Sequence, residues 1–145
     1  MTAKIVVDTS VLIKWIKRRD EELRREALAL LGIIQRRPLE VTAPALLLYE
    51  VGNLLLWKTQ LDSGGVAAAL EQILDLPITI VNPEAALLRR AARLGRELRL
   101  TFYDSSFLAL AEELDCLLIT ADRKLFDTAR VIPRVRHLSA IGSIA

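Results

Sequence analysis

Four acidic residues stand beside or inside apolar segments, where the packing of helices and strands alone does not call for a charge. They are spread over the chain and are Asp8, Glu50, Asp104 and Asp122. Carboxylates brought within about 5 Å of one another repel by about 3 kcal/mol per pair at an effective dielectric of about 20. If the four converge, they need a divalent cation. Oxygen ligands without His or Cys favour Mg²⁺, or alternatively Mn²⁺, over Zn²⁺.

Such an ion supports a particular reaction. It would lower the pKa of a bound water, which gives hydroxide near neutral pH, and it would screen a phosphodiester as that group gains charge. Hydroxyl groups near the acids would orient ligands or water, or would serve only as caps and turn formers; they belong to Thr9, Ser10, Ser105 and Thr120. The acids therefore predict metal-assisted hydrolysis of a phosphodiester.

Three of the four acids also have a simple structural interpretation. Asp8, Asp104 and Asp122 each stand where a helix is expected to begin, and Asp is a common N-cap residue. Glu50 differs, because apolar residues flank it on a helical wheel and also occupy the opposite side, so its helix is expected to be buried on all sides. A carboxylate there is costly unless it is paired or bound to a cation. We expect Asn53 to hold Glu50 in place, with an Arg partner as the alternative.

The scarcity of Cys and His excludes other chemistries. Cys116 and His137 are each the only residue of their type. A metal-free ribonuclease mechanism with two histidines and a zinc site of Cys and His ligands are therefore ruled out. Gly64-Gly65 precedes an expected helix but lacks the Lys and the flanking pattern of a phosphate-binding loop. The chemistry must rely on carboxylates.

The elements that position the acids can be read from periodicity. Short apolar runs alternate with amphipathic segments, which predicts a three-layer α/β/α domain around a mostly parallel sheet. Strands are expected at 4–7, 40–42, 78–81, 117–120 and 135–138, and helices at 11–18, 21–37, 44–57, 64–74, 83–98, 104–114 and 122–130. Asp8 and Asp122 would then lie at carboxyl ends of strands, where such sheets bind ligands near a switch in strand order.

Several expected helices have recognisable start signals. Thr9 or Ser10 is expected to cap the first helix and Asp20 the second. Pro44 suits the first turn of the third helix, and Ser63 is expected to open the fourth. These signals predict where each helix begins.

Length and composition indicate one domain, residues 1–145, with 52% hydrophobic residues to build its core. No apolar run has the length of a membrane span, and the first residues lack the layout of a signal peptide, so a cytoplasmic location is expected. The net charge is only +2, but the 20 basic residues are mostly Arg, which suits a polyanionic partner. Candidates for guiding a strand toward the acids are Lys14, Lys17, Arg123 and Lys124.

Four blocks of the sequence resemble the signature segments of PIN-domain nucleases. They follow the order of that family and are residues 6–13, 49–51, 103–111 and 118–125. The likeness is greatest to the VapC toxins of type II toxin/antitoxin pairs and covers essentially the whole chain. The family resemblance implies a PIN-like fold and nuclease activity.

The resemblance also implies roles for individual residues. Asp8 and Asp104 match the principal Mg²⁺ ligands, while Glu50 and Asp122 match the acids that complete the catalytic pocket, directly or through water. Thr120 matches the hydroxyl residue ahead of the last acid, and Asp127 is expected to be an ordinary surface residue. Members of the family form homodimers, cleave RNA and are neutralised by a small antitoxin. The chain is thus expected to be a Mg²⁺-dependent endoribonuclease.

Two other functions stay open at this point. The chain could keep the pocket as a non-catalytic PIN domain that binds RNA or a protein in a regulatory role. It could also be a phosphoryl-transfer domain with Asp8 as nucleophile, although Ser10 stands where haloacid-dehalogenase phosphatases usually carry a second Asp.

Overall fold

The computed structural model describes residues 2–17 and 21–143, and this part of the chain contains five strands, seven α-helices and a final 3₁₀ helix. The strands are β1 (Ala3–Val7), β2 (Leu39–Pro44), β3 (Ile78–Val81), β4 (Leu117–Thr120) and β5 (Val135–His137). The helices are α1 (Thr9–Ile16), α2 (Arg24–Arg36), α3 (Leu46–Lys58), α4 (Ser63–Leu74), α5 (Ala85–Leu98), α6 (Phe102–Glu113), α7 (Arg123–Ala129) and the 3₁₀ helix η1 (Leu138–Ser143). Every expected strand and helix is present, and the ends differ by at most three residues.

The five strands form one parallel sheet in the order β3-β2-β1-β4-β5. The chain runs outward from β1 to β3 and then returns to the other side of β1 to form β4, so the strand order switches between β1 and β4. These two strands pair directly, with Ile5 opposite Leu117 and Val7 opposite Ile119. The residues that follow β1 and β4 therefore leave the sheet next to each other.

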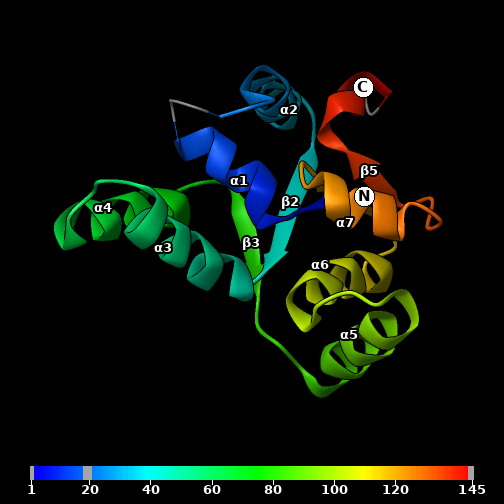
Figure 1. Ribbon diagram of the computed structural model, residues 1–145. Helices are drawn as coiled ribbons and strands as arrows, with labels where there is room; N and C mark the ends of the chain where they lie inside the picture. The colour runs from blue at the N-terminus through cyan, green and yellow to red at the C-terminus, as the bar shows by residue number, and fades with distance from the viewer. Residues whose placement is uncertain (1, 18–20, 144–145) are drawn as a thin grey trace.

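Helices cover both faces of the sheet, as the expected α/β/α class requires. Ile5 and Val7 of β1 pack into a cluster with α2 and η1, whereas Val6, on the other face, packs into the larger cluster with α3, α5 and α6. Figure 1 shows α2 and the pair α5 and α6 on opposite sides of the strands. The longest helix, α5, has 14 residues. In the described part of the chain, no helix is both long and apolar enough to span a membrane.

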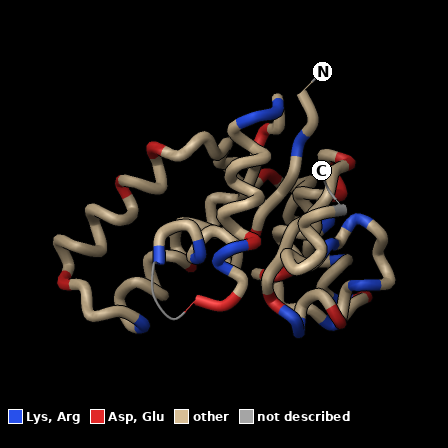
Figure 2. The backbone as a smooth tube through the Cα atoms, turned by 90° about the horizontal axis from the view of Figure 1, so that it is seen from above, with Lys and Arg blue, Asp and Glu red and all other residues tan. Residues whose placement is uncertain are grey.

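Helices α3 and α4 pack together as an arm that extends away from the sheet (Figure 1). The expectation that α3 is buried on all sides is wrong: its buried residues are Leu47, Val51 and Leu55, while Tyr49 is 78% exposed and Trp57 is 76% exposed. Only the stripe of α3 that carries these three buried leucine and valine residues packs against the rest of the protein, and no other described segment covers the outer sides of the helix. The arm has few positively charged residues. Lys58 is the only basic residue in 38–88, and Figure 2 shows little Lys or Arg colour along the arm.

Some helix starts differ from the expected ones. Pro44 ends strand β2 and does not lie in the first turn of α3. Helix α4 is capped by the side chain of Asp62, which accepts a hydrogen bond from the Gly65 amide, so Ser63 is the first helical residue. A carboxylate is the stronger acceptor for the free amides of a first turn. The expected cap Asp20 lies outside the described residues.

Candidate active site

A pocket of about 290 Å³ lies where the residues after β1 and β4 leave the sheet, and all four acids line it. Its lining residues are Asp8, Thr9, Ser10, Glu50, Asn53, Leu54, Asp104, Phe107 and Asp122. The acids come from four segments: the β1–α1 turn, the middle of α3, the first turn of α6 and the β4–α7 turn. The structure thus brings the four residues together, while their catalytic and metal-binding roles remain predictions.

Asp8 is buried and held through both of its carboxylate oxygens. Its side chain is the N-cap of α1, a place expected for Thr9 or Ser10, and Oδ1 accepts hydrogen bonds from the Val11 amide (3.3 Å) and the Ser10 hydroxyl (2.5 Å). Oδ2 accepts a hydrogen bond from the Thr120 hydroxyl (2.5 Å). Asp8 is therefore both a cap and a pocket residue, and its orientation is fixed from two sides.

The same two hydroxyls connect the β1–α1 turn with the β4–α7 turn. Ser10 Oγ accepts a hydrogen bond from the Ala121 amide (2.9 Å), and Thr120 Oγ1 accepts one from the Asp122 amide (3.0 Å). Ser10 and Thr120 therefore position both acids at the strand ends. Ser105 does not join them, because its buried hydroxyl donates to the Phe102 carbonyl of its own helix (3.1 Å).

Glu50 is held by a residue from another helix. The Thr9 hydroxyl donates to Glu50 Oε1 (2.8 Å) across 41 positions of sequence. Asn53, expected in this role, lines the pocket but makes no hydrogen bond to Glu50, and no Arg among the described residues forms an ion pair with it. Oε2 of Glu50 accepts no hydrogen bond from the described residues, and Glu50 lines the pocket.

The remaining two acids differ in their local roles. Asp122 caps α7, because its side chain accepts a hydrogen bond from the Leu125 amide (3.1 Å). Asp104 is not a cap: the hydroxyl of Thr101 accepts the hydrogen bond from the Asp104 amide (3.1 Å) at the start of α6. Asp104 is therefore not a helix cap. Asp8 and Asp122 are both helix caps and residues of the pocket lining.

Burial makes these acids harder to ionise. It raises the pKa of Asp8 from 3.8 to about 6, against the opposing effect of its hydrogen bonds. Burial is also the main cause that raises the pKa of Glu50 and of Asp104. Repulsion adds to this, since Asp122 acts on Asp8 and on Asp104, and Asp104 acts on Glu50. The pocket thus concentrates negative charge that the protein itself does not neutralise.

The donor set fits a hard cation that keeps part of its water shell. No group of three or more His, Cys, Asp or Glu side chains in the described residues is arranged as a metal site, so the carboxylates share a pocket without closing around one point. The four carboxylates are therefore farther apart than the ligands of a site that encloses its metal ion. Mg²⁺ usually takes one or two carboxylates and retains several waters. This fits Asp8 and Asp104 as direct ligands, with Glu50 and Asp122 acting through water.

Asp8 predicts a pH dependence of stability in metal-free buffer. Its pKa of about 6 lies above the ordinary 3.8, so the folded protein binds the proton more tightly than the unfolded chain. The free energy of unfolding should therefore fall as the pH rises from about 4 to about 6, by about 3 kcal/mol for this group at 1.4 kcal/mol per unit. Urea unfolding in EDTA checks this. Asp8→Asn should gain stability relative to the wild type over that range, and parallel pH curves for the two proteins would contradict the prediction.

Comparison with known proteins gives a family match over most of the chain. The model of the PIN domain matches residues 5–131. Exonuclease VapC9 of Pyrobaculum aerophilum is 31% identical over 136 residues, which cover 86% of this chain and 85% of that protein.

Solved structures share the fold at lower sequence identity. A toxin–antitoxin complex from Klebsiella pneumoniae contains a chain with a TM-score of 0.66 and 24% identity, covering 92% of this chain and 97% of that one. VapC20 of Mycobacterium tuberculosis, described as a Sarcin-Ricin loop cleaving toxin, has a TM-score of 0.67 and 20% identity, covering 86% and 95%. At these identities the likeness shows the fold.

Proposed function

Since the chain belongs to the PIN-domain family and is of the VapC type, we propose that it is a Mg²⁺-dependent endoribonuclease, with Mn²⁺ as a possible substitute, and the toxin of a toxin/antitoxin pair. The observation that carries the proposal is the pocket in which Asp8, Glu50, Asp104 and Asp122 meet at the strand switch. Asp8 and Asp104 are proposed as the metal ligands. Glu50 and Asp122 complete the catalytic set.

The residues of this chain have distinct tasks in the proposed hydrolysis. A bound Mg²⁺ would supply hydroxide from water and screen the phosphodiester. Ser10 and Thr120 keep the Asp8 carboxylate in one orientation. Thr9 donates to Oε1 of Glu50, so Oε2 is proposed to accept the proton of the attacking water, and burial, which raises the pKa of Glu50, makes this carboxylate a stronger base. Phe107 forms an apolar part of the wall.

Asp8 as the nucleophile of a phosphoryl-transfer domain is disfavoured. Phosphatases of the haloacid-dehalogenase type usually carry a second Asp two residues after the nucleophile, whereas here that residue is Ser10, which donates a hydrogen bond to Asp8 Oδ1. The same geometry suits a carboxylate that binds an ion with a fixed orientation. The pocket therefore supports hydrolysis by activated water.

The comparisons alone do not decide whether the substrate is RNA or whether cleavage is internal. VapC20 is described as cleaving the Sarcin-Ricin loop, whereas the relative from Pyrobaculum aerophilum is named an exonuclease. We favour internal cleavage, because cleavage of a loop is what the description of VapC20 states and what the resemblance to VapC toxins implies. A cytoplasmic site of action follows from an RNA substrate.

Metal removal and a substrate without ends test the proposal together. Circular RNA should be cut in Mg²⁺ and left intact in excess EDTA, as followed by conversion of circles to linear strands on a gel. Linear RNA of the same sequence controls for activity in general. Cleavage in excess EDTA would refute the metal mechanism, and cleavage of linear RNA alone would mark the enzyme as an exonuclease. RNA binding without cleavage across Mg²⁺ and Mn²⁺ titrations would favour the non-catalytic alternative.

The uncovered sides of α3 support proposed protein partners. Tyr49, Leu56 and Trp57 are large apolar side chains exposed on this helix, and such patches usually mark interfaces. We assign them to a homodimer, and a small antitoxin is the second proposed partner. Sedimentation should give a dimer at micromolar concentration, and Trp57→Glu should shift it toward monomer. A monomeric wild type would contradict this.

A further inference from the structure

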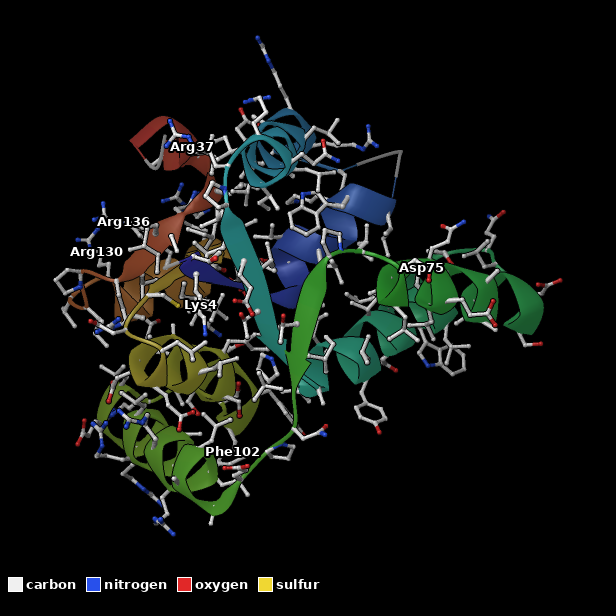
Figure 3. The ribbon with its side chains drawn as sticks, turned by 180° about the vertical axis from the view of Figure 1, so that it is seen from behind. Lys4, Arg37, Asp75, Phe102, Arg130 and Arg136 are labelled. Carbon is white, nitrogen blue, oxygen red and sulfur yellow. The ribbon has the colours of Figure 1, made fainter. Side chains whose placement is uncertain are left out.

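A second cavity, of about 380 Å³, lies between α7, β5 and the segment that follows β5. The charged residues in its lining are Arg123, Arg130 and Arg136, and no carboxylate lines it. His137 and Ser139 supply further polar groups. Figure 3 shows Arg130 and Arg136 on the same side of the molecule, near β5. Arg123 directly follows the pocket acid Asp122 at the start of α7, so the two linings include neighbouring residues of the chain.

Arg123 is held in place without a negative partner. Its guanidinium lies over the Phe126 ring, 5.6 Å from the centroid, and Nη2 is 3.4 Å from Nδ1 of His137. That Nδ1 also accepts a hydrogen bond from the Ser139 amide (3.2 Å). Since Nδ1 accepts, it carries no proton and the imidazole is neutral; burial, and then the charge of Arg123, lower the pKa of His137. A preoriented guanidinium with a neutral partner keeps its full positive charge.

The other two arginines of the cavity are also uncompensated. Within residues 2–17 and 21–143, neither Arg130 nor Arg136 forms an ion pair, and Arg136 donates only through Nε, to the Pro133 carbonyl (3.1 Å). Asp122 and Asp127 are near enough to act on the pKa of His137, but they lie outside the lining. Three guanidinium groups around one cavity predict an anionic ligand.

Two of the other basic candidates near the acids, Lys14 and Lys17, are less suited to such a ligand, while Lys124 acts on the pocket acid Asp104 and is not in the lining of this cavity. Lys14 lies 2.8 Å and Lys17 3.5 Å from carboxylate oxygens of Glu21, so both charges are already paired. The α3–α4 side offers only Lys58 in 38–88. Figure 2 shows that Lys and Arg lie mostly away from that arm. A polyanion that leaves the acid pocket therefore meets unpaired cations on the α7–β5 side.

We propose that the cavity lined by Arg123, Arg130 and Arg136 binds a backbone phosphate of the RNA strand next to the phosphate that is cleaved. The proposal rests on the proposed function, because the acid pocket holds the scissile group. Arg123 lines this cavity and directly follows Asp122, which lines the acid pocket, and its planar guanidinium matches two phosphate oxygens. The contact is to the backbone, so it adds affinity and register without reading sequence.

Binding of single-stranded RNA in Mg²⁺ tests the cavity directly. The measurement uses the Asp104→Asn background, so that the strand is not cut. Arg123→Gln and Arg136→Gln should each weaken binding about tenfold, the effect of a lost charge-assisted hydrogen bond. The slope of log K against log salt should fall by about 0.7 for each lost phosphate contact. Arg89→Gln is the matched control, because Arg89 is exposed on α5 and lines neither cavity.

A comparison of substrate lengths separates the cavity from the reaction centre. In the otherwise wild-type enzyme, Arg136→Gln should raise KM more for an oligonucleotide than for a dinucleotide with one phosphodiester; equal losses would overturn the proposal. If wild type cleaves RNA while Arg123→Gln and Arg136→Gln bind like Arg89→Gln, the cavity assignment is wrong and the proposed function stands. If wild type does not cleave but binding depends on these arginines, the proposed function is wrong and the phosphate site stands.

Discussion

Asp104→Asn is expected to lower kcat/KM for RNA cleavage by at least about 100-fold while the fold is kept. Asp104 lines the acid pocket, and Thr101 caps α6 in its place, so the substitution removes a carboxylate without removing a helix cap. Burial and the charge of Asp122 raise the pKa of Asp104. A neutral amide at this position relieves that repulsion, so thermal stability in EDTA should not fall.

The matched control for this substitution is Asp127→Asn. Asp127 is an exposed acid of α7 that lies outside the acid pocket, as the sequence led us to expect. Its replacement changes the net charge by the same amount and should leave cleavage within about twofold, as expected for a surface site. Initial rates on one labelled RNA compare the three proteins. Wild-type activity in Asp104→Asn would remove Asp104 from the mechanism.

Phe107→Ala is expected to lower the free energy of unfolding by about 3–5 kcal/mol, a large share of the 5–15 kcal/mol of a typical domain. Phe107 is 1% exposed, belongs to the main core cluster and also lines the acid pocket. Its loss leaves a cavity directly beneath the acids, because α6 cannot move toward the sheet without displacing Asp104. Urea unfolding of both proteins at one pH gives the difference.

The matched control is Phe102→Ala on the same helix. Phe102 is 45% exposed, so its truncation removes the same atoms but leaves a smaller cavity. The loss at this position should be clearly smaller than at Phe107. Equal losses would show that α6 is stabilised by its intrinsic helix formation and not by the packing of Phe107.

Much of the fold and part of the site could be predicted because they depend on local patterns. Apolar strands alternating with helices determine a parallel sheet, and the position of Asp8 and Asp122 after two strands was enough to expect them at the same edge. The adjacency of β1 and β4 then brings them together. The place of Glu50 and Asp104 relied on the PIN resemblance, since no periodicity connects α3 and α6 with those strand ends.

The remaining features depend on how elements pack, which local patterns do not encode. Asn53 was expected to hold Glu50 because helical spacing relates the two, but the packing of α1 against α3 places Thr9 there. The apolar pattern of α3 does not show which of its faces is buried in the chain, which is why the helix was wrongly expected to be buried on all sides although Tyr49 and Trp57 are exposed. Arg123 was among the basic residues expected to guide a strand, but its grouping with Arg130 and Arg136 around one cavity was not predicted, because it depends on how α7 packs against β5.

The pairing of β1 with β4 has a consequence for the synthesis of the protein. The first and the second-last strand of the chain frame the acids, so a nascent polypeptide has no complete reaction centre until Asp122 has emerged from the ribosome. For a protein that we propose cuts RNA, this order protects the message during translation. Translation has passed the codon of Asp122 before the product is able to attack any transcript, including its own.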